Sequence, residues 1–496
     1  MTAALEVQGL RIGFGGPAVV GGVSFSVAPG ECVAIVGESG AGKSLTARAL
    51  LGLSAGSVHV ERLLIDGEDA AGLGERAWRR LRGARIALVS QDALVSLDPL
   101  QRIGSEVAEP LRIHGLDAAP ERVQEQLRRV WMPDPERRAR QYSHELSGGL
   151  RQRALIASAL AAGPAVLVAD EPTTALDATV QARILALLRE IADAGTAVLF
   201  ISHDFAAVRR LADRVLVMRG GIVVEEGNTA DVLENPRHDY TRELIAATRH
   251  TPRATEEGDP TPVLVGSGVA KSFGGVPAVI DADFAVPEGR TLGVVGESGS
   301  GKTTLARMIV GVETPDAGEL RWQGTHRVQL VHQNPLGAFD PRWTIGRSLR
   351  EALAAGGVPR AQRAAKTAAL MAEVDLDPRL AERRPIALSG GQRQRAGIAR
   401  ALAAEPDVLV LDEPVSALDP SVRERVLQLL VRLQRTRGLT MIFVSHDLDV
   451  VGAVCDTVLV MQDGRIVEQG RVSEVFAAPR HPFTRELLAA SGQSLT

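Results

Sequence analysis

Two glycine-rich segments, each ending in a lysine and a hydroxyl side chain, have the composition of a phosphate-binding loop. The first reads VGESGAGKS over residues 36–44, and the second reads VGESGSGKT over residues 295–303. Glycines permit a tight turn whose backbone N–H groups converge on phosphate oxygens, and the helix-like run that follows adds the positive end of its dipole. We therefore expect each segment to bind the phosphates of a nucleotide.

The lysine and hydroxyl of each loop have distinct predicted tasks. Lys43 and Lys302 are predicted to reach the β- and γ-phosphates, while Ser44 and Thr303 offer a hydroxyl group to Mg²⁺. Only four of the 56 basic residues are lysines, and these loops hold two of the four. A compact ammonium group suits such a cradle better than the planar fork of arginine. The predicted phosphate-binding set is Gly37, Glu38, Ser39, Gly40, Ala41, Gly42, Lys43 and Ser44, with Gly296, Glu297, Ser298, Gly299, Ser300, Gly301, Lys302, Thr303 and Thr304.

Paired acids follow two apolar strand-like runs, VLVADE at 166–171 and VLVLDE at 408–413. Asp170 and Asp412 are predicted to hold Mg²⁺, directly or through water. Glu171 and Glu413 are predicted to be general bases that polarise the attacking water. One acid at a strand end is common, but a carboxylate pair repeated after the same hydrophobic strand indicates a hydrolytic site.

A second pair of motifs, LSGGLRQR at 146–153 and LSGGQRQR at 388–395, opens a helix in each half. Free backbone N–H groups and a hydroxyl at a helix N-terminus can receive an anion. Alone, such a motif would be a helix cap with a flexible turn, but next to a phosphate loop it indicates a nucleotide contact. The predicted residues are Ser147, Gly148 and Gly149, with Ser389, Gly390 and Gly391.

These motifs occur twice in the same order, so the chain is an internal repeat of two domain-sized halves. Gln91 precedes Ser147 by 56 positions, and Gln333 precedes Ser389 by 56. The interval between lysine and glutamine is 17 residues shorter in the second half, which predicts a trimmed β-subdomain there.

The elements that must position these residues are also readable. Apolar β-rich runs such as CVAIVG and AVLFIS alternate with helical stretches, which predicts α/β domains with a mostly parallel buried sheet. Residues 250–262 are polar and contain prolines, so they read as a linker. We expect a first domain over 1–249 and a second over 263–496.

The ordered motif set resembles that of the ATP-binding-cassette (ABC) ATPases over essentially the whole chain, twice. The resemblance implies two tandem P-loop NTPase domains, each with a sheet core and a helical subdomain, which pack head to tail around ATP and Mg²⁺. Lys43 would then share a nucleotide with Ser389, and Lys302 with Ser147.

Further roles follow from the same resemblance. Gln91 and Gln333 would sense the γ-phosphate, help hold Mg²⁺ and couple to a transmembrane partner. His203 and His446 would contact the γ-phosphate as catalytic residues. Phe14 and Phe273 match the aromatic that stacks on adenine. Leu150 and Thr174 depart from the usual glutamine and serine, which puts the equality of the two sites in doubt.

Within this family the chain is similar to the importers of oligopeptides, dipeptides and nickel. SQDALVSLDP, HQNPLGAFDPR and the tails NPRHDYTRELIAA and APRHPFTRELLAA carry the likeness. It implies two integral-membrane permease subunits and an extracytoplasmic solute-binding protein as partners. The chain would associate peripherally with the cytoplasmic face of the cell membrane through the permease. Its two cysteines, far apart, predict no iron–sulfur cluster.

Other interpretations remain open: a ribosome-acting tandem ATPase, a sugar or metal-chelate importer ATPase, and an excision-repair cassette. The linker is short and acidic, unlike the basic connection of ribosome-acting cassettes, and zinc cysteines are missing. A net charge of −4 gives no support for nucleic-acid binding. No apolar run reaches the roughly 20 residues that span a bilayer, and no signal peptide is expected.

Overall fold

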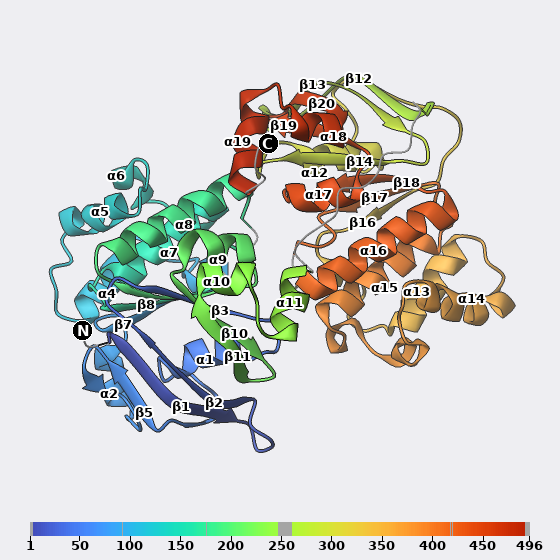
Figure 1. The fold of residues 1–496 in the computed structure, drawn as a ribbon. Coiled ribbons are helices and arrows are strands. Elements are labelled where there is room, and N and C mark those ends of the chain that lie inside the picture. The colour runs from blue at the N-terminus through green and yellow to red at the C-terminus, as the bar shows by residue number, and fades with distance from the viewer. Residues whose placement is uncertain are drawn as a thin grey trace. The chain divides into compact units, whose positions relative to one another are not determined.

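The structure is a computed structural model that describes residues 3–91, 93–174, 176–246, 260–416, 418 and 420–491. The chain divides into two compact units (Figure 1). The first consists of Met1–Leu176 and Val180–Thr248, and the second of Asp177–Thr179 and Arg249–Thr496. Most of the predicted linker, residues 250–259, lies outside the described residues, and Pro262 already opens a strand.

The first unit has two sheets. Among its described residues, six strands form a core sheet in the order β11-β10-β3-β9-β8-β7. Neighbouring strands of this sheet are parallel except β11, which pairs antiparallel with β10. The strands are β3 (Cys32–Val36), β7 (Ile86–Val89), β8 (Val166–Asp170), β9 (Ala197–Ile201), β10 (Arg214–Arg219) and β11 (Ile222–Asn228). Every residue of β3, β8 and β9 is buried, as expected for parallel strands covered on both faces.

A smaller antiparallel sheet packs against this core in the first unit. Its strands are β1 (Leu5–Gly13), β2 (Val20–Val27), β4 (Ser57–His59), β5 (Arg62–Ile65) and β6 (Glu68–Asp69). Leu10, Ile12 and Val20 from this sheet join Ile35 and Val168 of the core strands in one buried cluster. The antiparallel sheet therefore shares its hydrophobic core with the parallel one.

Helices of the first unit cover the parallel sheet and build a helical subdomain. Val107 of α4, Leu127 of α5 and Ile156 of α7 share one buried cluster with Phe200 of β9. The helices are α1 (Lys43–Ala49), α2 (Glu75–Leu81), α3 (Ala93–Ser96), α4 (Ile103–Ile113), α5 (Pro120–Arg129), α6 (Pro135–Arg138), α7 (Gly148–Leu160), α8 (Ala178–Asp193), α9 (Phe205–Leu211), α10 (Thr229–Glu234) and α11 (Asp239–Ala246).

The second unit repeats this design. Over its described part, the core sheet has the order β16-β17-β18-β14-β19-β20. The strands are β14 (Thr291–Gly296), β16 (Val328–Val331), β17 (Val408–Asp412), β18 (Thr440–Val444), β19 (Thr457–Gln462) and β20 (Arg465–Arg471). The helices are α12 (Lys302–Ile309), α13 (Ile345–Ala355), α14 (Arg360–Glu373), α15 (Gly390–Leu402), α16 (Pro420–Arg437), α17 (Leu448–Val454), α18 (Val472–Ala477) and α19 (Pro482–Ser491).

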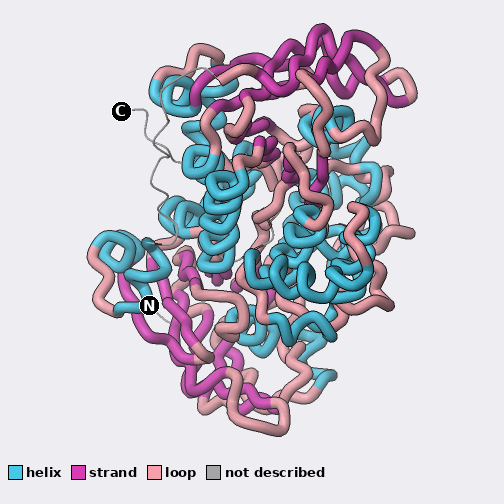
Figure 2. The backbone as a smooth tube through the Cα atoms, turned by 90° about the vertical axis from the view of Figure 1, so that its right-hand side faces the viewer, coloured by secondary structure: helices cyan, strands magenta, loops and turns pink. Residues whose placement is uncertain are grey.

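The small sheet differs between the units in the way that the shortened interval predicts. Over the described residues it has five strands in the first unit but three in the second, β12 (Pro262–Phe273), β13 (Val276–Pro287) and β15 (Ala317–Trp322). In the first unit β1, β2 and β5 lie together beside α2 (Figure 1), and Figure 2 shows the strands in magenta close to helices in cyan. The trimming of the β-subdomain is confirmed, and so is the predicted fold class of two α/β cassettes with mostly parallel core sheets.

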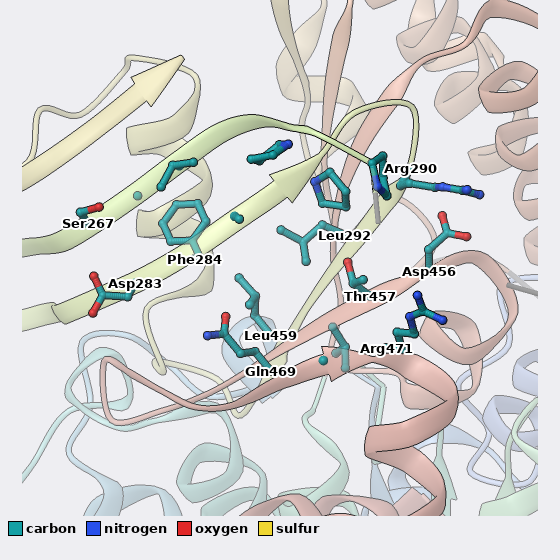
Figure 3. Close-up of a pocket in the computed structure, with 18 residues that line it drawn as sticks. Ser267, Asp283, Phe284, Arg290, Leu292, Asp456, Thr457, Leu459, Gln469 and Arg471 are labelled. Carbon is teal, nitrogen blue, oxygen red and sulfur yellow. The ribbon is translucent and has the colours of Figure 1, made fainter. Parts of the chain in front are cut away.

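A pocket of about 580 Å³ lies in the second unit where β12 and β13 meet β19 and β20 (Figure 3). Phe284, Leu292 and Leu459 line it, together with Thr457 and Gln469. In the first unit the position of Thr457 is taken by Arg214: each is the first residue of its strand, and each pairs with the last residue of the next strand. A long side chain in one unit is thus replaced by a short one beside an open space in the other.

Candidate nucleotide sites

The first glycine-rich loop joins β3 to α1 and turns sharply. Gly37 has a φ of 151°, and an added Cβ there would lie 2.3 Å from the backbone oxygen of Met218. Gly42 caps α1 with a φ of 98°, a left-handed conformation that favours glycine. Lys43 is buried, and its Nζ donates to the backbone oxygens of Gly37 at 2.6 Å and Glu38 at 3.0 Å. The ammonium group therefore lies across the loop, as a phosphate-binding lysine requires.

The second loop joins β14 to α12 with the same geometry. A Cβ on Gly296 would lie 2.1 Å from the backbone oxygen of Met461. Lys302 Nζ donates to the backbone oxygens of Gly296 at 2.9 Å and Glu297 at 2.7 Å. Burial lowers the pKa of Lys302, while the carboxylate of Glu413 acts in the opposite direction. Both predicted lysines thus have the same place in their loops.

The hydroxyl after each lysine meets the first acid of the predicted pair. Ser44 Oγ donates to Asp170 Oδ1 at 3.0 Å, and Thr303 Oγ1 donates to Asp412 Oδ1 at 3.3 Å. Burial raises the pKa of both carboxyl groups above the ordinary value. A nearby cation would offset that cost of burial.

This donor set fits Mg²⁺ in the manner of nucleotide sites. Magnesium keeps several waters and is held by one or two protein oxygens together with substrate phosphates. Among the described residues, no group of three or more His, Cys, Asp and Glu side chains is placed to hold a metal by itself. A hydroxyl and a carboxylate at each loop are therefore a partial cage that nucleotide phosphates would complete.

The glutamates leave their strands in an unusual backbone conformation. Glu171 and Glu413 have φ values of 49° and 47°, in the left-handed region that non-glycine residues rarely adopt. Such strain persists only where the surroundings hold it in place, and it is common at active sites. The backbone N–H of Glu171 donates to Ile201 O, and that of Glu413 to Val444 O, so the adjacent strand fixes both turns.

In the first unit, three side chains converge on the carboxylate of Glu171. Gln91 Nε2 and Thr174 Oγ1 each lie 3.1 Å from Oε2, and His203 Nδ1 lies 3.2 Å from Oε1. Burial acts to raise the pKa of Glu171, but the hydrogen bond and charge of His203 and the charge of Lys43 outweigh it. The pKa lies below its ordinary value, so the carboxylate is ionised at neutral pH.

In the second unit, Gln333 Nε2 donates to Glu413 Oε2 at 2.8 Å, and His446 Nδ1 lies 3.2 Å from Oε1. The pKa of Glu413 is again lowered: burial is outweighed by His446 and Lys302. Burial alone would lower the pKa of His446, but the hydrogen bond with Glu413 raises it. The structure thus brings together the predicted lysine, acid pair, glutamine and histidine within each unit.

Sequence reasoning missed the carboxylate contact of Thr174. It marked this residue only as a departure from serine, whereas the threonine hydroxyl donates to the Glu171 side chain. Ser416, at the corresponding place, donates to the backbone oxygen of Glu413, and a hydrogen bond from its hydroxyl also helps to lower the pKa of the Glu413 carboxyl group. The three-residue spacing from each glutamate was the signal for these contacts.

The signature motifs cap their helices unequally. Ser389 Oγ accepts from Gln392 N at 3.4 Å, and Gln392 Oε1 accepts from Ser389 N at 3.0 Å, which makes a reciprocal capping box. Ser147 Oγ accepts from Leu150 N at 3.4 Å, but the leucine side chain has no oxygen to accept from Ser147 N and complete the box. The first signature is therefore held by one hydrogen bond fewer at its start. Gly148, Gly149, Gly390 and Gly391 form the first turn after the caps.

The two aromatics predicted to stack on adenine have exposed rings. Phe14 follows β1 and is 51% exposed, and Phe273 ends β12 and is 47% exposed. Lys271 Nζ lies 5.6 Å from the centroid of the Phe273 ring. Both rings are open to a ligand, and adenine stacking stays a prediction.

No helix in the described part of the chain is long and apolar enough to cross a membrane.

Family models match both halves of the chain. The model described as ABC transporter matches residues 20–174 and 279–416. The model described as Oligopeptide/dipeptide transporter, C-terminal region, matches residues 224–263 and 467–493, which contain both tails singled out above. The resemblance to peptide-type ABC importers is therefore confirmed.

Curated relatives agree. The chain is 41% identical to the Peptidoglycan transport ATP-binding protein YejF of Agrobacterium fabrum, over 98% of this chain and 96% of the relative. It is 39% identical to the Glutathione import ATP-binding protein GsiA of Shigella flexneri, over 98% of this chain and 89% of the relative.

Solved structures show the same fold at low identity. A complex of an archaeal ribosome recycling factor, aABCE1, has a TM-score of 0.69 at 22% identity, over 97% of this chain and 92% of that chain. The RNase-L Inhibitor has a TM-score of 0.68 at 23% identity, over 97% of this chain and 93% of that chain. At this identity the likeness concerns the fold alone. With two family models and relatives that align over nearly its whole length, the chain belongs to the ABC transporter family and is one of its ATP-binding ATPases, in the oligopeptide/dipeptide group.

Proposed function

We propose that this chain binds and hydrolyses ATP to power an importer of short peptides or peptide-like solutes. The observation that carries the proposal is the occurrence, in each unit, of a complete catalytic set beside a tail of the oligopeptide/dipeptide type. Relatives named for glutathione import and peptidoglycan transport support peptide-like cargo. The two cassettes would be domains over residues 1–249 and 263–496.

Within each site the side chains have separate tasks. Glu171 and Glu413 accept a proton from the attacking water, since their pKa values keep them ionised. Gln91 donates to Oε2 of Glu171, and Gln333 donates to Oε2 of Glu413. A movement of the segment after either glutamine would therefore be transmitted to the base. His203 and His446 lie beside Oε1 of Glu171 and Glu413 and orient these oxygens, and they would contact the γ-phosphate.

ATP and Mg²⁺ are the ligands that these residues suit. The loop amides with Lys43 and Lys302 would hold the phosphates, and Phe14 and Phe273 the adenine. Ser44 and Thr303, with Asp170 and Asp412, would hold Mg²⁺, and Gln91 and Gln333 would complete its protein contacts. The metal ion neutralises charge on the β- and γ-phosphates when it is bound. The signature residues Ser147–Gly149 and Ser389–Gly391 would offer hydroxyl and backbone N–H groups to a nucleotide phosphate.

Permease subunits in the membrane are the proposed partners, with a solute-binding protein outside the cell. A groove of about 690 Å³ in the second unit runs beside β16, α13 and α15, and His332 and Pro335, on either side of the Gln333 segment, line it. A permease element seated there would contact the segment that carries the Glu413 partner. This geometry supports coupling between hydrolysis and the membrane subunit, with the chain at the cytoplasmic face.

The test is capture of partners followed by transport. Tagged chain purified from solubilised membranes should carry multi-span permease subunits. In proteoliposomes the reconstituted complex should hydrolyse ATP faster when a short peptide and the solute-binding protein are present, and a disaccharide should give no such stimulation. Capture of ribosomes without membrane proteins would instead support the ribosome-acting interpretation, and stimulation by the disaccharide alone would support a sugar importer.

A further inference from the structure

The tail of the first unit contacts the phosphate loop of the same unit. Tyr240, the second residue of α11, is 3% exposed, and its hydroxyl accepts a hydrogen bond of 3.1 Å from the backbone N–H of Glu38. The two residues are 202 positions apart in the chain. A buried side chain of the oligopeptide-type tail thus contacts the main chain of the first phosphate-binding loop.

Glu38, the residue that Tyr240 contacts, is also hydrogen-bonded to Lys43. The backbone oxygen of Glu38 accepts from Lys43 Nζ at 3.0 Å, while its N–H donates to Tyr240. Both polar main-chain groups of Glu38 therefore have defined partners. Tyr240 of the tail therefore holds the same stretch of loop backbone to which the Lys43 ammonium group is hydrogen-bonded.

Two further contacts support the brace. The Arg219 guanidinium lies 4.6 Å from the centroid of the Tyr240 ring, within the range of a cation–π interaction. Arg219 ends β10, and shortly after it the N–H of Gly221 donates to the backbone oxygen of Ala41 in the phosphate loop at 3.1 Å. The turn after β10 and the tail helix hold the loop at two points.

The tail itself is anchored by polar contacts that both units share. Glu225 accepts from the backbone N–H groups of Arg237 at 2.7 Å and His238 at 3.1 Å, and Tyr240 N donates to His238 Nδ1.

In the second unit, Glu468 accepts from the N–H groups of Arg480 at 2.8 Å and His481 at 3.0 Å, and Phe483 N donates to His481 Nδ1. The anchoring of the tail is therefore the same in both units.

What differs is the group that meets the loop. Phe483 stands where the first unit has Tyr240, and phenylalanine carries no hydroxyl. Gln462 stands where the first unit has Arg219. The second cassette keeps the anchored tail and the turn contact, since Gly464 N–H donates to the backbone oxygen of Ser300 at 3.2 Å, but it has no hydroxyl or guanidinium at the two replaced positions. It is therefore a natural comparison for the contact that Tyr240 makes.

We infer that Tyr240 is a positioning residue and that α11 braces the first phosphate loop for nucleotide binding. The loop of the first site is held in shape before ATP arrives, so less conformational freedom is lost on binding. The second site lacks this aid, which makes the two sites unequal in their affinity for ATP. This inference rests on the proposed role of Lys43 in binding phosphate.

The experiment removes only the hydroxyl, by Tyr240→Phe in the full-length chain. Binding of a fluorescent ATP analogue with Mg²⁺ is titrated in a Lys302→Ala background, which reports the first site, and in a Lys43→Ala background, which reports the second. One neutral hydrogen bond corresponds to an affinity change of about two- to tenfold. The first site should lose about that much affinity, and the second site should not change.

Steady-state hydrolysis separates positioning from general damage. With Tyr240→Phe, KM for ATP should rise, by no more than that factor because only one of the two sites is affected, while kcat stays near its original value because the base and its partners are untouched. Unchanged first-site affinity, or an equal loss at both sites, would overturn the inference. Full nucleotide binding in the Lys43→Ala, Lys302→Ala double variant would instead contradict the proposed sites themselves.

Discussion

Arg214 joins the two sheets of the first unit, and Arg214→Thr should loosen that junction. Its Nη1 donates to Glu31 Oε1 at 2.9 Å and to the backbone oxygen of Ser26, in β2, at 3.3 Å. Its Nη2 forms an ion pair with Glu226, in β11. The Arg214 side chain is 28% exposed, that of Glu31 is 18% exposed and that of Glu226 is 39% exposed.

The expected loss follows from these exposures. Removing the guanidinium leaves the part-buried Glu31 carboxylate without its charged partner, at a cost of about 1–3 kcal/mol. The more exposed pair with Glu226 contributes about 1 kcal/mol or less. Together these two losses lower the local free energy of opening by about 1–4 kcal/mol. The second unit tolerates Thr457 at this position because Arg290 and Gln469 replace the two carboxylates.

Hydrogen–deuterium exchange measures this locally. Amides of β10 and β11 should exchange about fivefold faster or more, since 1.4 kcal/mol corresponds to tenfold. Peptides from β19 and β20 in the same sample are the internal control and should not change. Arg214→Lys keeps the positive charge but lacks the planar guanidinium that bonds to several acceptors at once, and should give an intermediate effect. Less than a threefold change in the exchange rates of β10 and β11 would show that Arg214 does not hold the two sheets together.

Three further predictions concern chemistry. Chelation of Mg²⁺ should abolish ATP hydrolysis, and Asp170→Asn should raise the Mg²⁺ concentration needed for half-maximal rate; hydrolysis that persists in excess chelator would contradict the metal assignment. Lys43→Ala and Lys302→Ala should each impair the whole chain, and mixing the two variant chains should rescue little if both nucleotides are bound within one chain; strong rescue would show sites formed between chains. Burial raises the pKa of the Cys32 thiol, so labelling of the native chain by a disulfide reagent should stay slow between about pH 7 and pH 9 and become complete on unfolding, whereas fast native labelling that grows with pH would show an accessible thiol.

Much of each site could be predicted because it is local in sequence or fixed by the sheet. The loop before Lys43 follows β3, and Asp170 and Glu171 lie at the end of β8, with β9 between these two strands. Because the three strands are parallel, the loop and the acids lie at the same edge of the sheet. The repeat then transferred every assignment to the second half. Glycines at positive φ, such as Gly42, were predictable from the tightness of the turn.

Other features depend on contacts that no spacing rule describes. The hydroxyl of Tyr240 meets Glu38 across 202 positions, and the tail motif gives no sign of that acceptor. The pocket beside Thr457 forms where distant strands of the second unit meet. That Arg214 has the place of Thr457 in the first unit becomes clear only when the strand pairings of β10 and β19 are compared. The hydroxyl of Thr174 reaches the Glu171 carboxylate, an acceptor that the three-residue spacing alone does not identify. Side-chain packing between distant segments decided each of these.

Glu171 and Glu413 are the proposed bases of two hydrolytic sites. Replacing both by glutamine keeps the shape and an acceptor oxygen for Gln91 and Gln333, but removes the group that takes the proton. A general base contributes about 10²-fold or more to the rate. Binding of ATP should be retained, because the loops and their lysines are unchanged.

The most direct measurement is phosphate release by the purified chain carrying Glu171→Gln and Glu413→Gln, at saturating ATP and Mg²⁺, with ATP binding measured on the same sample. Phosphate release should be slower by about 10²-fold or more while ATP remains bound. Release at a near-normal rate would show that neither glutamate is the base.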